Sequence, residues 1–355
     1  HGSTDFALSV AVAVAALGMG MLFITASGAS LSDATEAFVE GGFGTRSNFA
    51  NTLSKTIPLV FVALGWIVVF RAGRFHVGFP GQILIGGLFV SVVALELSLP
   101  AGLHLPLAVL AGALGGAAWA GITAWLWAKR GVNEILSTLL LNLIAIQVIS
   151  WIVRGPLQQP DSPLPISAPL ADSARWPDLL TETTLKLDFL LIPLAVVGVA
   201  FLLARTTLGF RIRLVGTNPQ AARFAGLSPT RTGVSAILIS GALAGLAGSS
   251  LLIGGGTRNM TDQFDAGYGF QGIAVALLAR NSPWGVLPAA LLFATLRQGG
   301  GVMEATAAVS SAVVDLTQGI VILLVLAATS LLHFARRDSG EPSAQPLPPM
   351  EAKAA

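Results

Sequence analysis

The chain of 355 residues contains no cysteine, and only 11 % of its residues are charged. The missing cysteine excludes disulfides, thiolate metal sites and cysteine nucleophiles. Twenty Lys and Arg with eighteen Asp and Glu cannot cover the polar surface of a soluble protein of this length, which carries about 25 % charged residues. Because 54 % of the residues are hydrophobic, the composition predicts that most of the chain spans a membrane.

Several catalytic signatures are also missing. The chain has no Gly-Lys dipeptide and therefore no phosphate-binding loop, so it cannot be its own ATPase. It contains neither Gly-x-Ser-x-Gly nor His-Glu-x-x-His, the patterns of serine hydrolases and zinc proteases. The four His residues are scattered without metal-ligand spacing. We therefore predict no catalytic residue, no metal site and no cofactor held by this chain.

Apolar segments predict an all-α integral membrane protein with about ten transmembrane helices. Strand alternation is absent, which argues against a β-barrel. The eighth segment has about 13 residues, too few to cross a bilayer of roughly 30 Å. Either it pairs with the ninth across a break at 280–282, or it is a short helix that lines a cavity. The stretch from Gly73 to Gly87 is a second interruption of this kind. The segments are 6–27, 52–70, 80–98, 104–127, 133–153, 187–204, 232–253, 267–279, 283–300 and 309–334.

The distribution of Lys and Arg predicts the topology. If both termini are cytoplasmic, which ten spans permit, the cytoplasmic loops hold most of the basic residues, as the positive-inside rule requires. The proline-rich segment 154–186 is then an ordered external loop, and 205–231 is a cytoplasmic segment. We expect residues 1–5 to be an N-terminal tail left by cloning, 6–334 to form one transmembrane domain, and 335–355 to be a disordered cytoplasmic tail.

The segment 205–231 predicts a short capped helix on the cytoplasmic side. It contains several Arg residues and no acidic residue. Asn218 suits the N-cap, Pro219 the first helical turn and Gly226 the stop. Such a helix between two spans can transmit motion if a partner binds it. A solvated basic loop that follows the positive-inside rule explains the same composition, and the sequence leaves this alternative open.

Four segments, in this order along the chain, resemble the permease subunits of bacterial nucleoside-type ABC importers, which are related to the ribose and branched-chain amino acid permeases. The spacing Ala221-Ala222-x-x-x-Gly226 resembles the coupling helix of such permeases, which docks in a groove of the ATPase subunit. The resemblance covers roughly residues 55–330, nearly the whole membrane part. The four segments are Gly131–Asn142 (GVNEILSTLLLN), Arg213–Gly226 (RLVGTNPQAARFAG), Ser240–Gly248 (SGALAGLAG) and Gly267–Leu278 (GYGFQGIAVALL).

The resemblance implies a permease subunit in the bacterial cytoplasmic membrane that imports a small polar solute, with nucleosides as the expected substrate. It implies two ATP-binding-cassette ATPase subunits, or one fused ATPase, which hold ATP and Mg²⁺. It also implies a second permease subunit, in a heterodimer, and an extracytoplasmic substrate-binding lipoprotein. Lipid surrounds the chain, and nucleic acid is not an expected partner. The ATPase would dock on Asn218, Pro219, Ala221, Ala222, Arg223 and Gly226.

Two alternative functions stay open at this point. A permease of an ABC importer for a sugar such as ribose fits the same resemblance. An ion-coupled secondary transporter is a different class, and it usually needs an intramembrane carboxylate relay or a sodium cage. Only Glu134, Glu304 and Asp315 are near membrane depth, so this second alternative has few residues to support it.

The chain departs from the family in one segment after the second span. The family typically has a sequence like Phe-Asn-Ile-Gly-x-Glu-Gly-Gln there. The segment Phe75–Gln82 instead has His76 in place of the Asn and Pro80 in place of the Glu. This departure leaves the ligand and any role of that Glu open.

Intramembrane polar residues are candidates for the substrate pathway, because they are costly in lipid and can offer donors and acceptors to a polar solute. Hydrogen bonding between helices explains such residues equally well. We expect Glu134 to be an ion-pair partner or an acid at a helix N-terminus, beside Lys129 and Arg130. The pathway candidates are Gln82, Asn142 and Gln271, with Phe79 and Phe270 as residues that stack on a base or sugar or face the core.

Overall fold

The computed structural model describes residues 30–160, 162–255, 259–307, 316, 319 and 320, and this part is helical without a β-strand. Two π-helical turns, η1 (Glu40–Gly44) and η4 (Ser250–Gly254), and two 3₁₀ turns, η2 (Asp172–Ala174) and η3 (Leu187–Leu190), adjoin the helices. The helices are α2 (Leu31–Val39), α3 (Arg46–Arg71), α4 (Phe79–Glu96), α5 (Ala101–Arg130), α6 (Glu134–Val153), α7 (Leu191–Arg205), α8 (Thr207–Thr217), α9 (Pro219–Phe224), α10 (Pro229–Ser249), α11 (Tyr268–Leu278) and α12 (Val286–Ala307).

Seven helices in the described residues are long and apolar enough to cross a membrane. They correspond to seven of the ten predicted segments, and the eighth segment is the shorter helix α11. The first predicted segment, 6–27, and nearly all of the tenth, 309–334, lie outside the described residues. The seven are Arg46–Arg71, Phe79–Glu96, Ala101–Arg130, Glu134–Val153, Leu187–Arg205, Pro229–Gly254 and Val286–Thr306.

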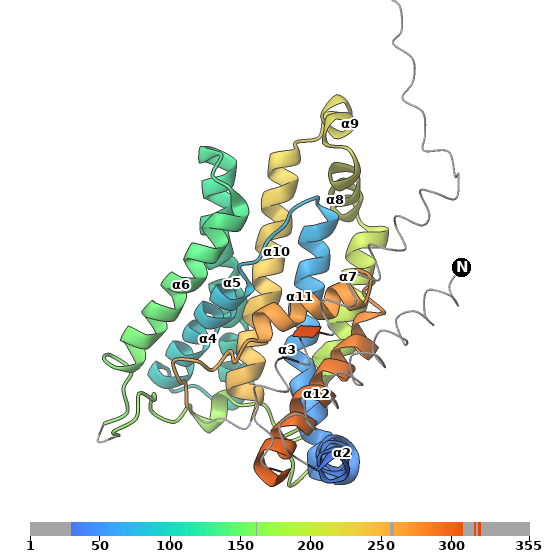
Figure 1. Ribbon diagram of the computed structural model, residues 1–355. Helices are drawn as coiled ribbons and strands as arrows, with labels where there is room; N and C mark the ends of the chain where they lie inside the picture. Colours follow the sequence, from blue (N-terminus) through green and yellow to red (C-terminus); the bar gives the residue numbers. More distant parts are fainter. Residues whose placement is uncertain (1–29, 161, 256–258, 308–315, 317–318, 321–355) are drawn as a thin grey trace, which may run out of the picture.

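The bundle has two distinct ends. The helix α9 lies at one end, and α2 lies at the opposite end with the connecting segment between α6 and α7 (Figure 1). Backbone hydrogen bonds tie that connecting segment to η4 and to the residues between η4 and α11, from Trp176 N–H to Ile253 O at 3.1 Å and from Ser167 N–H to Met260 O at 3.0 Å. The segments predicted to be cytoplasmic and external therefore lie at opposite ends of the molecule.

The central helix is α3, which packs against α10, α11, α12 and α7. Trp66, Phe61 and Ile57 on α3 are buried, as is Phe79 at the start of α4. The outer helices α6 and α7 instead keep apolar side chains exposed, for example Trp151 at 68 %. Apolar surface of this kind belongs against lipid or a partner subunit.

Glycines bring the backbones of α4, α5 and α10 into direct contact. A Cβ atom at Gly245 would overlap Gly112 O, and a Cβ at Gly116 would overlap Gly241 O. A Cβ at Gly86 would lie 2.6 Å from Gly245 Cα. We call these five residues the glycine seam. Small residues permit such close approach where no hydrophobic effect drives helices together.

Two breaks in helical structure lie where the sequence predicted interruptions. Between α11 and α12, Arg280 and Asn281 adopt positive φ angles of 54° and 53°, so the short helix and its successor form a broken pair. Trp66 Nε1 donates to Asn281 Oδ1 at 3.1 Å. The second break separates α3 from α4, where residues 72–78 are non-helical. It is shorter than the predicted interruption from Gly73 to Gly87, because α4 begins at Phe79. The Phe79 ring packs against Trp66 of α3 with centroids 6.4 Å apart. The helix α4 therefore begins beside the last turns of α3 rather than beyond its end at Arg71.

Candidate functional sites

The N-terminus of α9 is capped by its own sequence. Asn218 Oδ1 accepts hydrogen bonds from the backbone N–H groups of Gln220 and Ala221, both at 3.0 Å. Pro219 occupies the first turn, where its missing N–H leaves no helix bond unmade. The helix begins at the predicted residue.

The C-terminus of α9 ends in a left-handed residue, Gly226, with φ of 76°. Gly226 N–H donates to Arg223 O, and Leu227 N–H donates to Ala222 O, each at 2.9 Å. These two bonds form the Schellman arrangement, which satisfies the last carbonyl groups of a helix. The two caps fix α9 as a rigid protrusion although it has only six residues.

The exposed surface of α9 consists mainly of Arg223 and Phe224. Ala222 is fully buried, whereas Phe224 is 94 % exposed, and Arg223 and Ala221 are exposed as well. An aromatic ring held out on a fixed turn is a suitable anchor for a protein partner, because aromatic side chains dominate interface energies. Ala222 serves instead to pack α9 onto the rest of the chain.

The helix α8 precedes α9 and packs closely against the end of α3. A Cβ atom at Gly216 of α8 would overlap Arg71 O. Across the same contact, Gly73 has φ of 70°, and a Cβ there would lie 3.2 Å from Gly216 Cα. The helix α8 therefore contacts both α9 and the start of the non-helical segment 72–78.

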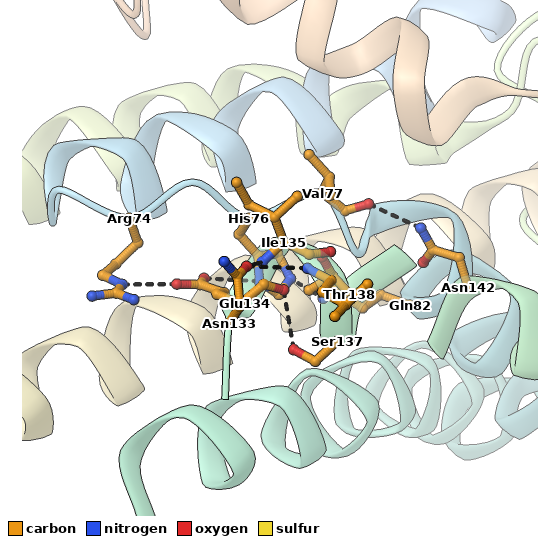
Figure 2. A network of polar contacts seen from close by, with 11 residues as sticks. Arg74, His76, Val77, Gln82, Asn133, Glu134, Ile135, Ser137, Thr138 and Asn142 are labelled. Atoms are coloured by element: carbon orange, nitrogen blue, oxygen red, sulfur yellow. Dashed lines mark hydrogen bonds and ion pairs between the residues drawn. The ribbon is translucent and has the colours of Figure 1, made fainter. Parts of the chain in front are cut away.

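That segment leads into a buried polar network at the start of α6 (Figure 2). Arg74 Nε donates to Glu134 Oε2 at 2.8 Å, and the Glu134 side chain is only 4 % exposed. The Arg74 guanidinium also lies over the Trp127 ring at 3.8 Å from its centroid. Glu134 is thus both an ion-pair partner and a first-turn acid of α6, with Arg74 as its cation rather than Lys129 or Arg130.

His76 stands at the centre of this network and is fully buried. Its Nδ1 lies 3.2 Å from Glu134 Oε1, and its Nε2 contacts the Gln82 amide nitrogen. With the Gln82 amide nitrogen donating to Nε2, the proton of the neutral ring lies on Nδ1 and donates to the carboxylate. The residue that replaces the Asn of the family segment therefore links α4 to α6.

Pro80, the other departure from the family segment, lies in the first turn of α4. It is buried, and a Cβ atom at Gly269 would lie 2.6 Å from Pro80 N. The proline ring therefore fixes how closely α4 approaches α11.

Asn142 holds the backbone of the same break. Its Oδ1 accepts from Gly81 N–H at 2.9 Å, and its Nδ2 donates to Val77 O at 3.0 Å. Both ends of the amide are therefore used by protein backbone. Gln82 differs, because its Oε1 has no hydrogen-bond partner in the described part of the chain. The role of either residue in the substrate pathway stays a prediction.

The other pathway candidates lie apart from Gln82 and Asn142. Phe79 is fully buried, whereas Phe270 is 52 % exposed on α11. Gln271 Oε1 accepts from Arg297 at 3.1 Å, and the Arg297 guanidinium lies over the Tyr268 ring at 4.3 Å. The structure thus brings Phe79, Gln82 and Asn142 together at the break before α4, and Gln271 joins a second polar cluster on α11 and α12.

A cavity of about 380 Å³ lies between α3, η3, η4, α11 and α12, toward the end of the bundle that holds α2. None of the residues predicted for the substrate pathway or for ATPase docking lines this cavity. The signal that could have found its lining residues is a charged residue at the edge of an apolar segment, as Asp188 is in 187–204. Lining residues with polar groups include Asn51, Lys55, Asp188, Ser250, Tyr268 and Gln298.

The described residues contain no group of three or more His, Asp or Glu side chains that could hold a metal ion. The polar clusters above are therefore built from hydrogen bonds and single ion pairs. They are suited to holding backbone in place and to contacting a polar solute, and they offer no evident nucleophile with an adjacent base.

Comparison with known proteins gives the chain a family. Residues 48–326 match the family described as branched-chain amino acid transport system / permease component. The chain is 36 % identical to the glucose ABC transporter permease protein TsgB13 of Haloferax volcanii, over 89 % of this chain and 86 % of that protein. It is 34 % identical to the guanosine ABC transporter permease protein NupP of Bacillus subtilis, over 87 % and 89 % of the two chains.

A third relative is the nucleoside ABC transporter permease protein NupB of Lactococcus lactis, 34 % identical over 72 % of this chain and 73 % of that protein. No solved structure matches the chain. Permease subunits are not enzymes themselves, and they are multi-pass proteins of the inner membrane. With the seven apolar helices and the matched family model, the chain belongs to the permease components of ABC importers that include the branched-chain amino acid and nucleoside permeases.

Proposed function

We propose that this permease moves nucleosides across the membrane and that ATPase subunits drive it by docking on α9. The observation that carries the docking proposal is Phe224, which is 94 % exposed on a helix capped at both ends. The names of the guanosine and nucleoside permeases among its relatives support the substrate. ATP and Mg²⁺ would be held by the ATPase subunits.

The contacts of α9 indicate a route for the driving motion. ATPase closure would displace α9, and α8 would carry the displacement to Gly73 through its contact at Gly216. The segment 72–78 would then move relative to α6, to which Arg74 and His76 are bonded. The proposed docking helix α9 and the break before α4 are thereby connected through backbone contacts and one buried network.

The opposite end of the bundle would receive the substrate-binding lipoprotein. The connecting segment 154–186 and α2 form that end (Figure 1). A second permease subunit, in a heterodimer, would cover part of the apolar surface that α6 and α7 leave exposed. Leu143 and Leu194 are 61 % and 67 % exposed on these helices.

The docking proposal is tested with Phe224→Ala and Phe224→Asp in the complete transporter. Because the ring makes almost no contact within the chain, both variants should keep the melting temperature of the wild type. We expect ATPase subunits to be lost on purification through the permease and ATP-driven uptake to fall at least about tenfold, as for an interface anchor worth 2 kcal/mol or more.

The matched control is Phe89→Ala, since Phe89 is 44 % exposed on α4, outside α6, α7 and α9. This variant should retain both ATPase subunits and uptake. If both Phe224 variants also retain them, α9 is not the docking helix.

A sugar is the second candidate substrate, because the relative with 36 % identity is named as a glucose permease. Uptake of labelled inosine, D-ribose and D-glucose by cells with the complete transporter separates the candidates. Saturable, ATP-dependent uptake of inosine alone would support the nucleoside, and uptake of one sugar alone would replace it. The ion-coupled alternative is no longer needed, because the chain belongs to an ABC permease family.

A further inference from the structure

The cavity between α3, η3, η4, α11 and α12 combines a carboxylate, an ammonium group, amides and aromatic rings. Its volume of about 380 Å³ lies within the range of small-molecule sites, about 300 to 1,000 Å³. We propose that this cavity binds a sugar ring through two adjacent hydroxyl groups, with Asp188 and Lys55 as their partners. The proposal rests on the proposed function, since nucleosides and free sugars share these hydroxyl groups.

Asp188 carries the first step of the argument. It is 1 % exposed, and its Oδ2 accepts from Ser250 Oγ at 2.6 Å. Its Oδ1 makes no hydrogen bond of ordinary geometry within the described residues. A buried carboxylate oxygen without a donor is costly. A ligand that supplies an O–H group would remove that cost.

Lys55 supplies the complementary group on α3. Its Nζ donates to Gln298 Oε1 at 2.7 Å, and an ammonium group has three hydrogens. The remaining hydrogens can donate to ligand oxygens. A hydroxyl group both donates and accepts, and both Asp188 and Lys55 line the cavity, so the hydroxyls of one sugar ring offer a donor for Asp188 and an acceptor for Lys55.

The charges and rings of the cavity favour a neutral cyclic ligand. Lys55 and Asp188 carry opposite charges, so an anion would gain one contact and be repelled by the other. Phe264 also lines the cavity and offers an apolar face to the ring of a sugar or a base. A zwitterionic amino acid is the competing ligand, and the experiment below includes it.

The missing cysteine makes a direct occupancy test possible, because a single introduced thiol has no background. Ser54 lines the cavity, and Ser54→Cys changes one atom of its side chain. The full-length variant, purified with its ATPase subunits in lipid nanodiscs, is treated with a small methanethiosulfonate reagent. Mass spectrometry of the intact chain gives the labelling rate. Ser32→Cys is the control, since Ser32 is exposed on α2 and does not line the cavity.

The probes are inosine, 2′,3′-dideoxyinosine, D-ribose, D-glucose and L-leucine. We expect inosine, a free sugar, or both to slow labelling at Ser54→Cys and leave Ser32→Cys unaffected. The concentration that gives the same protection should be at least about tenfold higher for the dideoxy analogue than for inosine. This is the factor expected for losing a hydrogen bond to a charged group. The concentrations of inosine and of each free sugar that give half of the full protection are then compared. The ligand with the lower value shows whether a nucleoside or a free sugar supplies the hydroxyl groups.

Three results would overturn the proposal. They are equal protection by inosine and its dideoxy analogue, protection by L-leucine alone, and no protection by any probe. Asp188→Asn gives a second measurement, because it keeps an oxygen for Ser250 and removes the charge. It should abolish the preference for inosine over the dideoxy analogue, whereas Asp262→Asn, whose carboxylate pairs with Arg154 on the surface, should keep it.

The proposed function has its own separate readout. If cells with the wild-type transporter take up neither nucleoside nor sugar, the proposed function fails. If uptake is normal but the cavity residues show none of the effects above, only the assignment of this cavity fails.

Discussion

Glu134 joins the start of α6 to two side chains of the segment 72–78, so its loss should destabilise the described structure. Its carboxylate accepts from Arg74 Nε at 2.8 Å and lies 3.2 Å from His76 Nδ1. Glu134→Ala removes both partners at once. Glu134→Gln keeps an oxygen for His76 and removes only the charge.

The structure sets the size of each effect. In Glu134→Ala, the His76 N–H is left buried without a partner, which costs about 1–3 kcal/mol. Arg74 is 26 % exposed, so its ion pair is worth nearer the surface value of about 0.2–1 kcal/mol. We expect a total of about 1–4 kcal/mol for Glu134→Ala and about 0.2–1 kcal/mol for Glu134→Gln.

The assay is thermal unfolding of the full-length chain in lipid nanodiscs, followed by intrinsic tryptophan fluorescence. The expected order of melting temperatures is wild type, then Glu134→Gln, then Glu134→Ala. Glu36→Ala is the control, because Glu36 is exposed on α2. A melting temperature of Glu134→Ala equal to that of the control would refute the network as a stabilising element. A value for Glu134→Gln as low as that for Glu134→Ala would show that the Arg74 pair dominates instead.

Two further predictions concern the glycine seam and the cap of α9. Gly245→Val should lower the free energy of unfolding by at least about 2–3 kcal/mol, because the added side chain overlaps α5. Gly198→Val on α7 is the control and should not lower it, because Gly198 has open space around it. Equal melting temperatures of the two variants would contradict the seam. Asn218→Ala removes the hydrogen bonds that cap α9 and should lower the local stability of this helix by about 1 kcal/mol. We expect faster amide hydrogen exchange at Gln220 and Ala221 with an unchanged melting temperature. Unchanged exchange at these two residues would show that the cap is dispensable.

Local chemistry made much of the fold predictable. The caps of α9 depend on Asn218, Pro219 and Gly226 within nine residues of one another, so the sequence alone located this helix. The short eighth segment and the interruption at Gly73 were also visible, because length and glycine content are local properties. Helix α2 was not predicted, since its nine residues are too few for an apolar run.

The candidate sites were less predictable because their partners are far apart in sequence. His76 and Glu134 are 58 residues apart, and only the packing of α4 on α6 brings them together. Asp188 and Lys55 meet at one cavity for the same reason. Sequence reasoning placed Asn142 among pathway residues by its motif. It could not anticipate that Gly81 and Val77 would use both ends of its amide.

The glycine seam has a mechanical consequence. Where side chains separate two helices, rotamer changes let the helices slide over each other, but α4, α5 and α10 touch through backbone atoms. These three helices must therefore move as one rigid body. Any alternation between outward-open and inward-open states then has to occur at the borders of that body, where α3, α6, α11 and the segment 72–78 meet it.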